Sequence, residues 1–234
     1  MYQLGFVYAR SDSARLPNKA FLPLAGLPMI EVVMRRVAKV VEPILLTTHR
    51  PVDDDLAQLV LSKGYRVLRG DPDDLVQRTL QAVNETGVNQ FLRVNGDSPF
   101  FDAALLSKLA DLSQCCDLTT NLITRSFPYG ISAEIISADW FCSMASSYEQ
   151  AEAEHVTKHL YRQFEKARVG SVVCNHDYQT RRLTVDTEKD YQSVRQIFAK
   201  APSVTDIHWW EVVGAKKCPP FVFRSPESVE VLID

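Results

Sequence analysis

Apolar runs alternate with segments of helical period along the first half of the chain. Gln3 to Tyr8 and Pro43 to Thr48 have the apolar character of buried strands, and residues 28 to 40 between them carry apolar side chains at helical spacing. A proline opens this helix, at a position where its missing N–H costs no hydrogen bond. The strand–helix–strand order predicts an α/β domain with parallel strands.

The same order is repeated further along the chain. Helices are predicted near Val52 to Lys63 and Asp74 to Thr86, and a strand follows each of them, at Tyr65 to Leu68 and at Gln90 to Val94. Asp102 then stands in the position of a helix N-cap. This part of the chain therefore predicts parallel strands that are connected by helices.

Beyond Cys116 the alternation is less regular, and we expect a mixed sheet there. Strands are predicted at residues 117–121, 133–137, 171–174 and 182–185, with two tail strands at 221–224 and 229–233. No linker rich in Pro, Gly or Ser and no internal repeat divides the chain. We therefore expect one α/β domain over residues 1–234.

Composition and charge exclude several classes of function. Hydrophobic residues make up 46% of the chain, and the formal net charge is -3 without any run of five Lys or Arg, so the basic surface of a nucleic-acid-binding protein is missing. The amino terminus lacks the features of a signal peptide, and no segment approaches the ~20 apolar residues of a membrane span. We expect a cytoplasmic protein whose five cysteines, which form no C-x-x-C pair, are reduced.

A polar loop follows the first predicted strand. Residues 9–19, ARSDSARLPNK, carry Arg10, Arg15 and Lys19 and are called the cationic loop below. Ligands of open α/β sheets bind beyond the carboxyl ends of the strands, and three cations there suit a triphosphate. The loop is neither a P-loop nor a G-x-G-x-x-G motif, so a solvated surface loop explains these residues equally well.

Two carboxylates follow later predicted strands. Asp97 stands in the turn NGDSP after Val94, and Asp186 ends the segment RRLTVDT. Two aspartates from separate strand ends could share one Mg²⁺, a hard cation that prefers oxygen ligands. Two other interpretations remain open, because Asp97 could simply form a turn and Asp186 could cap the helix that begins near Glu188.

Taken together and in this order, the motifs resemble the cytidylyltransferases of bacterial surface-sugar synthesis. The sequence is more similar to the spore-coat polysaccharide type than to the CMP-Kdo and CMP-sialic acid synthetases, and the matches run from Phe6 to Tyr191. The resemblance implies a Rossmann-like, three-layer nucleotidyltransferase fold with a mostly parallel mixed sheet, that of the nucleotide-diphospho-sugar transferases. It also implies transfer of CMP from CTP to a sugar-type acceptor, an acidic sugar or a sugar phosphate, with release of pyrophosphate.

The family's motifs assign roles to residues of the nucleotide site. Its loop A-R-x-x-S-x-R-L-P-x-K implies that the CTP is held by Ala9, Arg10, Ser13, Arg15 and Lys19. Arg69 and Arg78 match segments that border the nucleotide, and Asn95, before the G-D-x-P turn, would touch the base. The resemblance also implies that Asp97 and Asp186 are the ligands of Mg²⁺. Lys19, Arg10 and Asp97 are thus the predicted catalytic residues.

The acceptor side departs from the family pattern. Where relatives show P-D-G-x-D-x-E, this chain reads P-Y-G-I-S-A-E, with Tyr129 and Ser132 in place of aspartates and Glu134 retained. We expect these three residues to face the acceptor, together with His155 of the E-H-V-T segment, Glu154 to Thr157. For His155, ordinary helix packing is an equally good interpretation.

A milder departure lies in the cationic loop. Asn18 stands where relatives usually have glycine, and asparagine tolerates a left-handed backbone better than most residues do. The loop can therefore keep its shape.

Other functions on the same scaffold remain open at this point. They are a nucleotidyltransferase that uses UTP or GTP, a glycosyltransferase of similar architecture, and a homologue that binds nucleotide or sugar without catalysis. A glycosyltransferase often carries a D-x-D metal motif, whereas the turn here reads NGDSP. Relatives are often dimers, and Trp209 with Trp210 is a candidate contact for a homodimer, although core packing explains the pair equally well.

Overall fold

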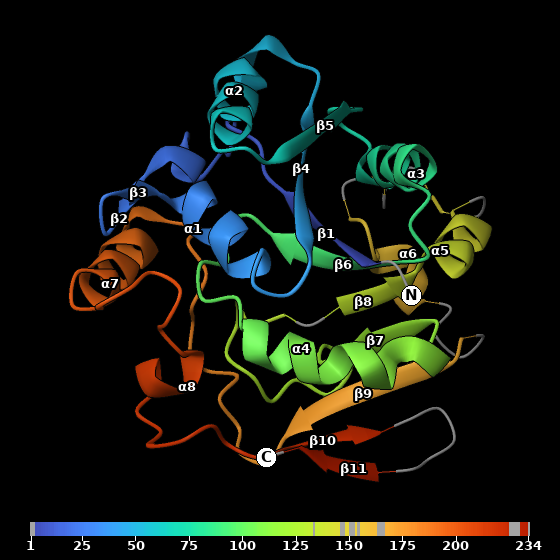
Figure 1. The fold of residues 1–234 in the computed structure, drawn as a ribbon, viewed down its shortest axis with the longest axis vertical. Helices are drawn as coiled ribbons and strands as arrows, with labels where there is room; N and C mark the ends of the chain where they lie inside the picture. The colour runs from blue at the N-terminus through green and yellow to red at the C-terminus, as the bar shows by residue number, and fades with distance from the viewer. Residues whose placement is uncertain are drawn as a thin grey trace.

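The computed structural model describes residues 3–132, 134–145, 148–149, 153, 155–162, 167–224 and 230–233. Within these residues a nine-stranded sheet has helices on both faces (Figure 1). The strands of this sheet are β1 (Gln3–Tyr8), β4 (Glu42–Thr48), β5 (Arg66–Gly70), β6 (Gln90–Asn95), β7 (Leu118–Thr120), β8 (Glu134–Ser137), β9 (Val169–Cys174), β10 (Phe221–Arg224) and β11 (Glu230–Ile233). A separate small hairpin consists of β2 (Pro23–Leu24) and β3 (Leu27–Pro28).

The strand order of the large sheet is β11-β10-β9-β7-β8-β6-β1-β4-β5. β5, β4, β1 and β6 are parallel neighbours, and Phe6 lies in register with Ile44 of β4 and Arg93 of β6. β8 runs antiparallel to both β6 and β7, and β9, β10 and β11 alternate in direction. The prediction of parallel strands first and a mixed sheet afterwards is confirmed.

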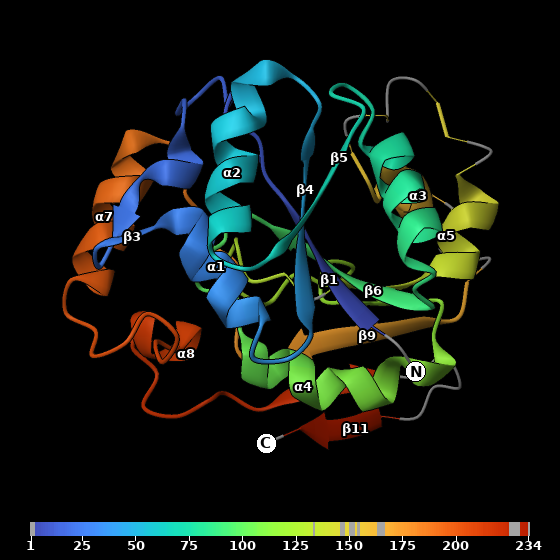
Figure 2. The same cartoon turned by 45° about the horizontal axis from the view of Figure 1, so that its top comes forward.

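Two groups of helices cover the two faces of the sheet (Figures 1 and 2). One face packs against α1 (Met29–Val37), α2 (Asp54–Ser62), α4 (Ala103–Leu112), α7 (Glu188–Phe198) and α8 (Trp209–Val212). The other face packs against α3 (Leu75–Thr86), α5 (Ala138–Met144) and α6 (Lys158–Tyr161). Three short 3-10 turns, at Lys19–Phe21, Pro51–Asp53 and Ser113–Cys115, complete the described helical segments.

The alternation of side chains along the strands explains this layering. On β1, Leu4 and Phe6 face the core under α3 and α5, whereas Val7 faces the core under α1. Aromatic contacts tie the first core together, and Phe91 of β6 stacks on Phe6 with ring centroids 5.0 Å apart. The strands are buried on both faces, as is usual for parallel sheets that are covered by helices.

Helix caps confirm the boundaries that the sequence predicts for two helices. The Asp74 carboxylate accepts a hydrogen bond of 2.9 Å from the backbone N–H of Gln77 at the start of α3, and Gly87 ends that helix in a left-handed conformation. The Asp102 carboxylate accepts a bond of 2.9 Å from the N–H of Leu105 at the start of α4. Both aspartates therefore satisfy backbone donors that the helix itself leaves unpaired.

The predicted strand at residues 182–185 is wrong. Within the part of the chain that the structure describes, the segment forms a single bridge, between Arg182 and Tyr129. The bridge consists of two bonds, from the N–H of Tyr129 to the carbonyl of Arg181 and from the N–H of Leu183 to the carbonyl of Tyr129. Beyond it the N–H of Val185 donates to the carbonyl of Asp97 instead. The segment crosses between two loops and has no neighbouring strand to extend a ladder.

The interpretation of Asp186 as a helix cap is also wrong. Thr187 is the N-cap of α7, and its hydroxyl accepts a bond of 3.2 Å from the N–H of Asp190, whose carboxylate bonds back to the N–H of Thr187. This reciprocal pair leaves Asp186 outside the cap. The predicted strand boundaries at residues 133 and 229 lie outside the described residues.

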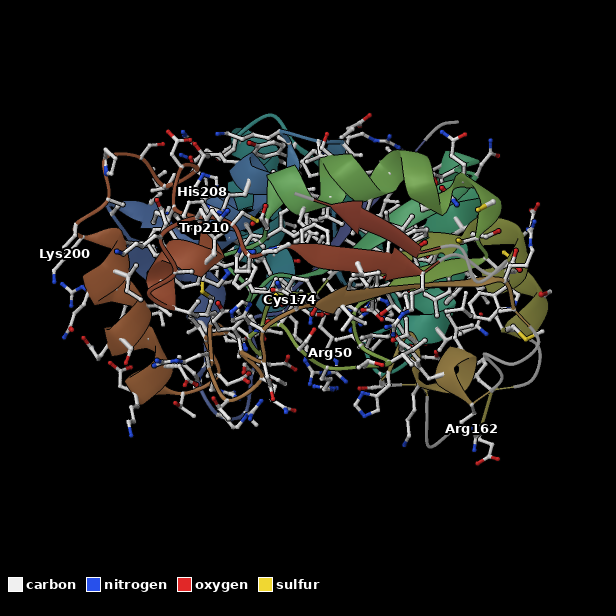
Figure 3. The ribbon with its side chains drawn as sticks, turned by 90° about the horizontal axis from the view of Figure 1, so that it is seen from below. Arg50, Arg162, Cys174, Lys200, His208 and Trp210 are labelled. Carbon is white, nitrogen blue, oxygen red and sulfur yellow. The ribbon has the colours of Figure 1, made fainter. Side chains whose placement is uncertain are left out.

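The two neighbouring tryptophans occupy different environments. Trp209 is buried in the core, where its ring lies 5.4 Å from Phe127 and 5.6 Å from Tyr178, centroid to centroid. Trp210 is half-buried and stacks on His208 at 5.0 Å, on the side of the molecule drawn in Figure 3. Core packing thus accounts for Trp209, and the homodimer stays a prediction. None of the helices in the described ranges has the length and apolar character needed to traverse a bilayer.

The cap of α3 gives a direct test of this account of the fold. Asp74→Ala should lower the free energy of unfolding by at least about 1 kcal/mol, because it removes the acceptor for both the Gln77 N–H and the Tyr148 hydroxyl. Asp73→Ala is the matched control, since Asp73 is exposed and its ion pair with Arg50 should contribute less than about 0.5 kcal/mol. Equal stabilities of the two variants in urea titrations would contradict the assignment of the cap.

Candidate active site

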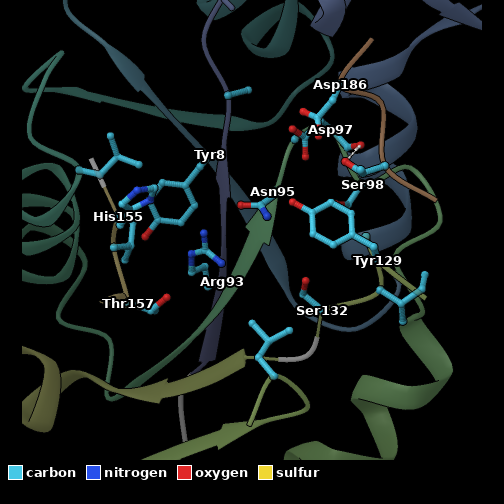
Figure 4. Close-up of a pocket in the computed structure, with 18 of the residues that line it drawn as sticks. Tyr8, Arg93, Asn95, Asp97, Ser98, Tyr129, Ser132, His155, Thr157 and Asp186 are labelled. Carbon is cyan, nitrogen blue, oxygen red and sulfur yellow. Dashed lines mark hydrogen bonds between the residues drawn. The ribbon is translucent and has the colours of Figure 1, made fainter. Parts of the chain in front are cut away.

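A cavity of about 1050 Å³ lies at the carboxyl ends of β1 and β6 (Figure 4). The described residues that line it come from the end of β1 with the cationic loop, the first turns of α3, the end of β6 with the turn after it, and residues 121–132, 155–161 and 179–186. This position is where ligands of open α/β sheets bind, because the parallel strands end there together. The cavity is therefore the candidate active site.

Lys19 joins the two aspartates that the sequence singles out. Its Nζ lies 2.6 Å from Asp97 Oδ2 and 3.2 Å from Asp186 Oδ1. The same ammonium donates a hydrogen bond of 2.9 Å to the carbonyl of Val185. The Asp186 side chain is only 7% exposed, and the Lys19 side chain 14%, so these charges interact in a partly desolvated environment.

Backbone contacts bring these three residues together from distant parts of the sequence. The N–H of Gly96 donates to the carbonyl of Tyr8, which places the turn after β6 against the start of the cationic loop. A Cβ on Gly96 would lie 2.8 Å from the Ala9 Cβ, so the approach requires glycine. On the other side, the carbonyl of Asp97 accepts bonds from the Val185 N–H and the Thr184 hydroxyl.

The two carboxylates are the residues of this site that could hold Mg²⁺. Asp97 Oδ2 and Asp186 Oδ1 both contact the same ammonium nitrogen, so they lie within reach of one small cation. Mg²⁺ is usually held by one or two carboxylates, with substrate phosphates and water completing its octahedron. Within the described ranges, no group of three or more His, Cys, Asp or Glu is arranged to hold a metal.

The other predicted nucleotide residues divide into two groups. Ala9, Arg10, Ser13, Arg15, Arg78 and Asn95 line the cavity. Arg10 is 41% exposed beside Asp12, and Arg15 Nη2 lies 2.9 Å from Asp186 Oδ1. Arg69 is not among the described lining residues, because its guanidinium is bonded to the carbonyls of Thr48 and Arg50.

Arg78 lines the cavity but is already held by the backbone. Its Nε donates a bond of 2.9 Å to the carbonyl of Asp71, and its Nη2 donates to the carbonyls of Asp71 and Pro72. Burial lowers the pKa of the Arg78 guanidinium. Arg78 therefore fixes the segment before α3 as well as contributing to the cavity wall.

Three of the four predicted acceptor residues line the cavity, and the fourth is buried. Tyr129, Ser132 and His155 line the cavity, whereas Glu134 is fully buried and is not among the described lining residues. The Glu134 carboxylate forms an ion pair with Arg93 Nη1 and accepts a bond of 2.9 Å from the hydroxyl of Tyr161. Glu134 thus lies behind the cavity wall, and its two partners, Arg93 and Tyr161, are part of that wall.

Arg93 and Tyr161 are two of the lining residues that the sequence motifs did not predict. Both line the cavity, and Figure 4 shows Arg93 near Tyr8 and Asn95. Burial raises the pKa of Tyr161 and the charge of Glu134 raises it further, so the phenol stays a hydrogen-bond donor. A signal for Arg93 was present, because an arginine within the apolar strand QFLRVN needs a buried partner.

Tyr129 packs on the ion pairs beside the candidate metal ligands. The Arg182 guanidinium lies 4.7 Å from the centre of the Tyr129 ring and forms ion pairs with Asp186 and Asp190. A tyrosine ring therefore covers this cation at a position where resembling chains have an aspartate. Glu154 lies outside the described residues, so the E-H-V-T segment is seen from His155 onward.

Three comparisons place the chain among known proteins. Residues 4–206 match the family model described as cytidylyltransferase. The spore coat polysaccharide biosynthesis protein SpsF of Bacillus subtilis (strain 168) is 26% identical over 223 residues, which cover 90% of this chain and 92% of that protein. A cytidylyltransferase structure from Leptospira borgpetersenii has a TM-score of 0.86 at 26% identity and covers 91% of this chain and 92% of its own.

A more distant structure shares the fold. A CMP:2-keto-3-deoxy-manno-octonic acid synthetase complexed with CTP has a TM-score of 0.63 at 16% identity, with 86% of this chain and 99% of that chain covered. At this identity the likeness establishes the α/β nucleotidyltransferase fold alone.

The buried ion pair behind the acceptor wall gives a second test. Glu134→Ala should lower the free energy of unfolding by about 3 kcal/mol, because it leaves the Arg93 guanidinium without its counterion. Glu42→Ala, which breaks a half-exposed pair with Arg66, should cost less than about 1 kcal/mol in the same denaturation experiment. Similar losses in the two variants would show that Arg93 does not depend on Glu134.

Proposed function

The chain belongs to the cytidylyltransferase family, and we propose that it transfers CMP from CTP to an acidic or phosphorylated sugar-type acceptor, with release of pyrophosphate. The observation that carries the proposal is the convergence of Lys19, Asp97 and Asp186 at the carboxyl ends of the parallel strands. A triphosphate needs fixed cations and a divalent metal; Lys19 would be one such cation, and the two aspartates would be ligands of the metal.

The cationic loop would hold the triphosphate. Arg10 and Arg15 line the cavity and keep much of their side chains exposed, so both guanidinium groups can reach phosphate oxygens. Lys19 places an ammonium group beside the carboxylates that would hold Mg²⁺. When bound there, Mg²⁺ would neutralise charge on the phosphates and on the leaving pyrophosphate.

The reaction itself needs no covalent enzyme intermediate. An oxygen of the acceptor attacks the α-phosphorus of CTP, the new P–O bond forms, and the bond to the pyrophosphate oxygen breaks. Positive groups that are already in place stabilise the charge that develops on the transferred and leaving phosphates. Asn95, which lines the cavity near Tyr8, is the candidate contact of the cytosine base.

The charge of the cavity supports an acidic acceptor. Its described lining residues include the cations Arg10, Arg15, Lys19, Arg78, Arg93, Arg125 and Lys158, against the two carboxylates Asp97 and Asp186. A concave site with this excess of positive charge attracts anions. A carboxylate or phosphate group on the acceptor therefore suits this cavity.

Pyrophosphate release by the purified protein tests the proposal. The assay contains Mg²⁺, each of the four nucleoside triphosphates and a panel of acidic and phosphorylated sugars. Release with CTP and one class of acceptor is the expected result. Release with UTP or GTP would reassign the nucleotide, and sugar transfer without pyrophosphate would indicate a glycosyltransferase. Nucleotide binding without turnover of any acceptor would contradict catalysis.

Asp97→Ala should abolish turnover while the fold is kept. We expect pyrophosphate release to fall at least about a hundredfold, because the change removes a proposed metal ligand from the site. Asp55→Ala, on the exposed side of α2, is the control and should keep wild-type activity. Full activity of the Asp97 variant at limiting Mg²⁺ would exclude Asp97 as a ligand.

Lys19→Ala should act mainly on the nucleotide. The expected result is weaker CTP binding and a kcat/KM for CTP that is lower by about a hundredfold, since a fixed cation beside the phosphates is lost. Steady-state kinetics at varied CTP measure this effect. Unchanged kinetic constants would remove Lys19 from the site.

A further inference from the structure

The segment between β4 and α2 lies against the cationic loop and contains a fully buried acid. Residues 48–54 are called the support segment here. Asp53 has no exposed surface, and its Oδ1 accepts a hydrogen bond of 2.7 Å from the backbone N–H of Ser11. Its Oδ2 accepts a bond from the hydroxyl of Thr48. Both oxygens of this carboxylate are therefore used within the protein, which is what a buried charge requires.

Ser11 is the point at which the cationic loop closes on itself. Its carbonyl accepts a bond of 2.9 Å from the N–H of Asn18, and Asn18 has the left-handed backbone expected at this position, with φ 56°. Asp53 holds the other side of the same residue through the Ser11 N–H. Arg15 lies inside this closed loop and Lys19 directly follows it, so the position of Ser11 determines where both cations lie.

The support segment is itself held in place by Arg69. Its Nε donates a bond of 2.8 Å to the carbonyl of Thr48, and its Nη2 donates to the carbonyl of Arg50 and lies 2.6 Å from Asp54 Oδ1. Arg50, which Figure 3 labels, makes a second contact with the cationic loop through an ion pair of 3.0 Å with Asp12. Arg69 thus acts on the loop through the support segment, without lining the cavity.

We propose that Asp53 is a positioning residue of the nucleotide site, which keeps the cationic loop in its binding conformation before CTP arrives. This inference rests on the proposed function, because it gives the loop a nucleotide to bind. A loop that is already ordered loses less conformational freedom on binding, and this gain appears as affinity. Asp53 would have no contact with CTP itself.

Binding of CTP in the presence of Mg²⁺, measured by calorimetry, tests the proposal in three variants. Asp53→Ala frees the Ser11 N–H and should weaken CTP binding about tenfold. Asp53→Asn keeps an oxygen acceptor of the same size and should retain affinity within about threefold of the wild-type value. Thr48→Val removes one of the two hydrogen bonds to Asp53 and should weaken CTP binding by an intermediate factor. If Asp53→Ala does not fold, Thr48→Val still tests the role of Asp53.

Asp117→Ala is the matched control for general destabilisation. The Asp117 carboxylate also accepts a backbone bond, of 2.9 Å from the N–H of Arg168, but it lies just before β7 and does not line the cavity. This variant should lose stability and keep wild-type CTP affinity. Hydrogen exchange without nucleotide adds a second readout, because amides of residues 9–19 should exchange faster in Asp53→Ala and not in Asp117→Ala.

The outcomes separate this inference from the proposed function. Wild-type affinity and loop exchange in both Asp53→Ala and Thr48→Val would overturn the role of Asp53, as would an equal loss of affinity in Asp117→Ala. A wild-type protein that does not bind CTP would overturn the proposed function, and the nucleotide role of Asp53 with it. In that case the exchange data still decide whether Asp53 holds the loop.

Discussion

Lys19 lies between two carboxylates that would otherwise repel one another, and the arrangement of the site depends on this contact. Asp97 follows β6, Asp186 lies on a segment that crosses the end of the sheet, and each reaches Lys19 from a distant part of the sequence. A cation between them offsets the cost of keeping two partly buried negative charges close together. The cationic loop, the turn at Gly96 and the crossing segment therefore have to fit one another as a unit.

Behind the cavity, buried carboxylates act on the site through other residues. Glu134 holds Arg93 and Tyr161 in the acceptor wall, and Asp53 holds the backbone of Ser11 behind the nucleotide side. In both places the charge is shielded from solvent and its oxygens are occupied by protein donors, so neither acid is available to a substrate. Tyr129 in turn covers the guanidinium that pairs with Asp186.

Local features of the fold and site could be predicted from the sequence, and features that depend on distant partners could not. The apolar runs of β1, β4 and β6, the cap at Asp102 and the left-handed Asn18 follow from short-range patterns, and the comparisons confirm the family resemblance. The burial of Glu134 depends on Arg93, 41 residues away, and the course of residues 182–185 depends on Tyr129 and Asp97. The spacing of apolar residues along the chain contains no information about such long-range contacts.

The fate of the individual phosphates of CTP distinguishes cytidylyl transfer from other uses of the nucleotide. The wild-type protein is incubated with Mg²⁺, a panel of acidic and phosphorylated sugars, and CTP that carries a radioactive label on either the α- or the γ-phosphate. Cytidylyl transfer predicts that the α-label enters a new sugar–CMP product while the γ-label appears in pyrophosphate. Label from the γ-phosphate in the sugar product or in inorganic phosphate, with the α-label left in CDP, would contradict the account.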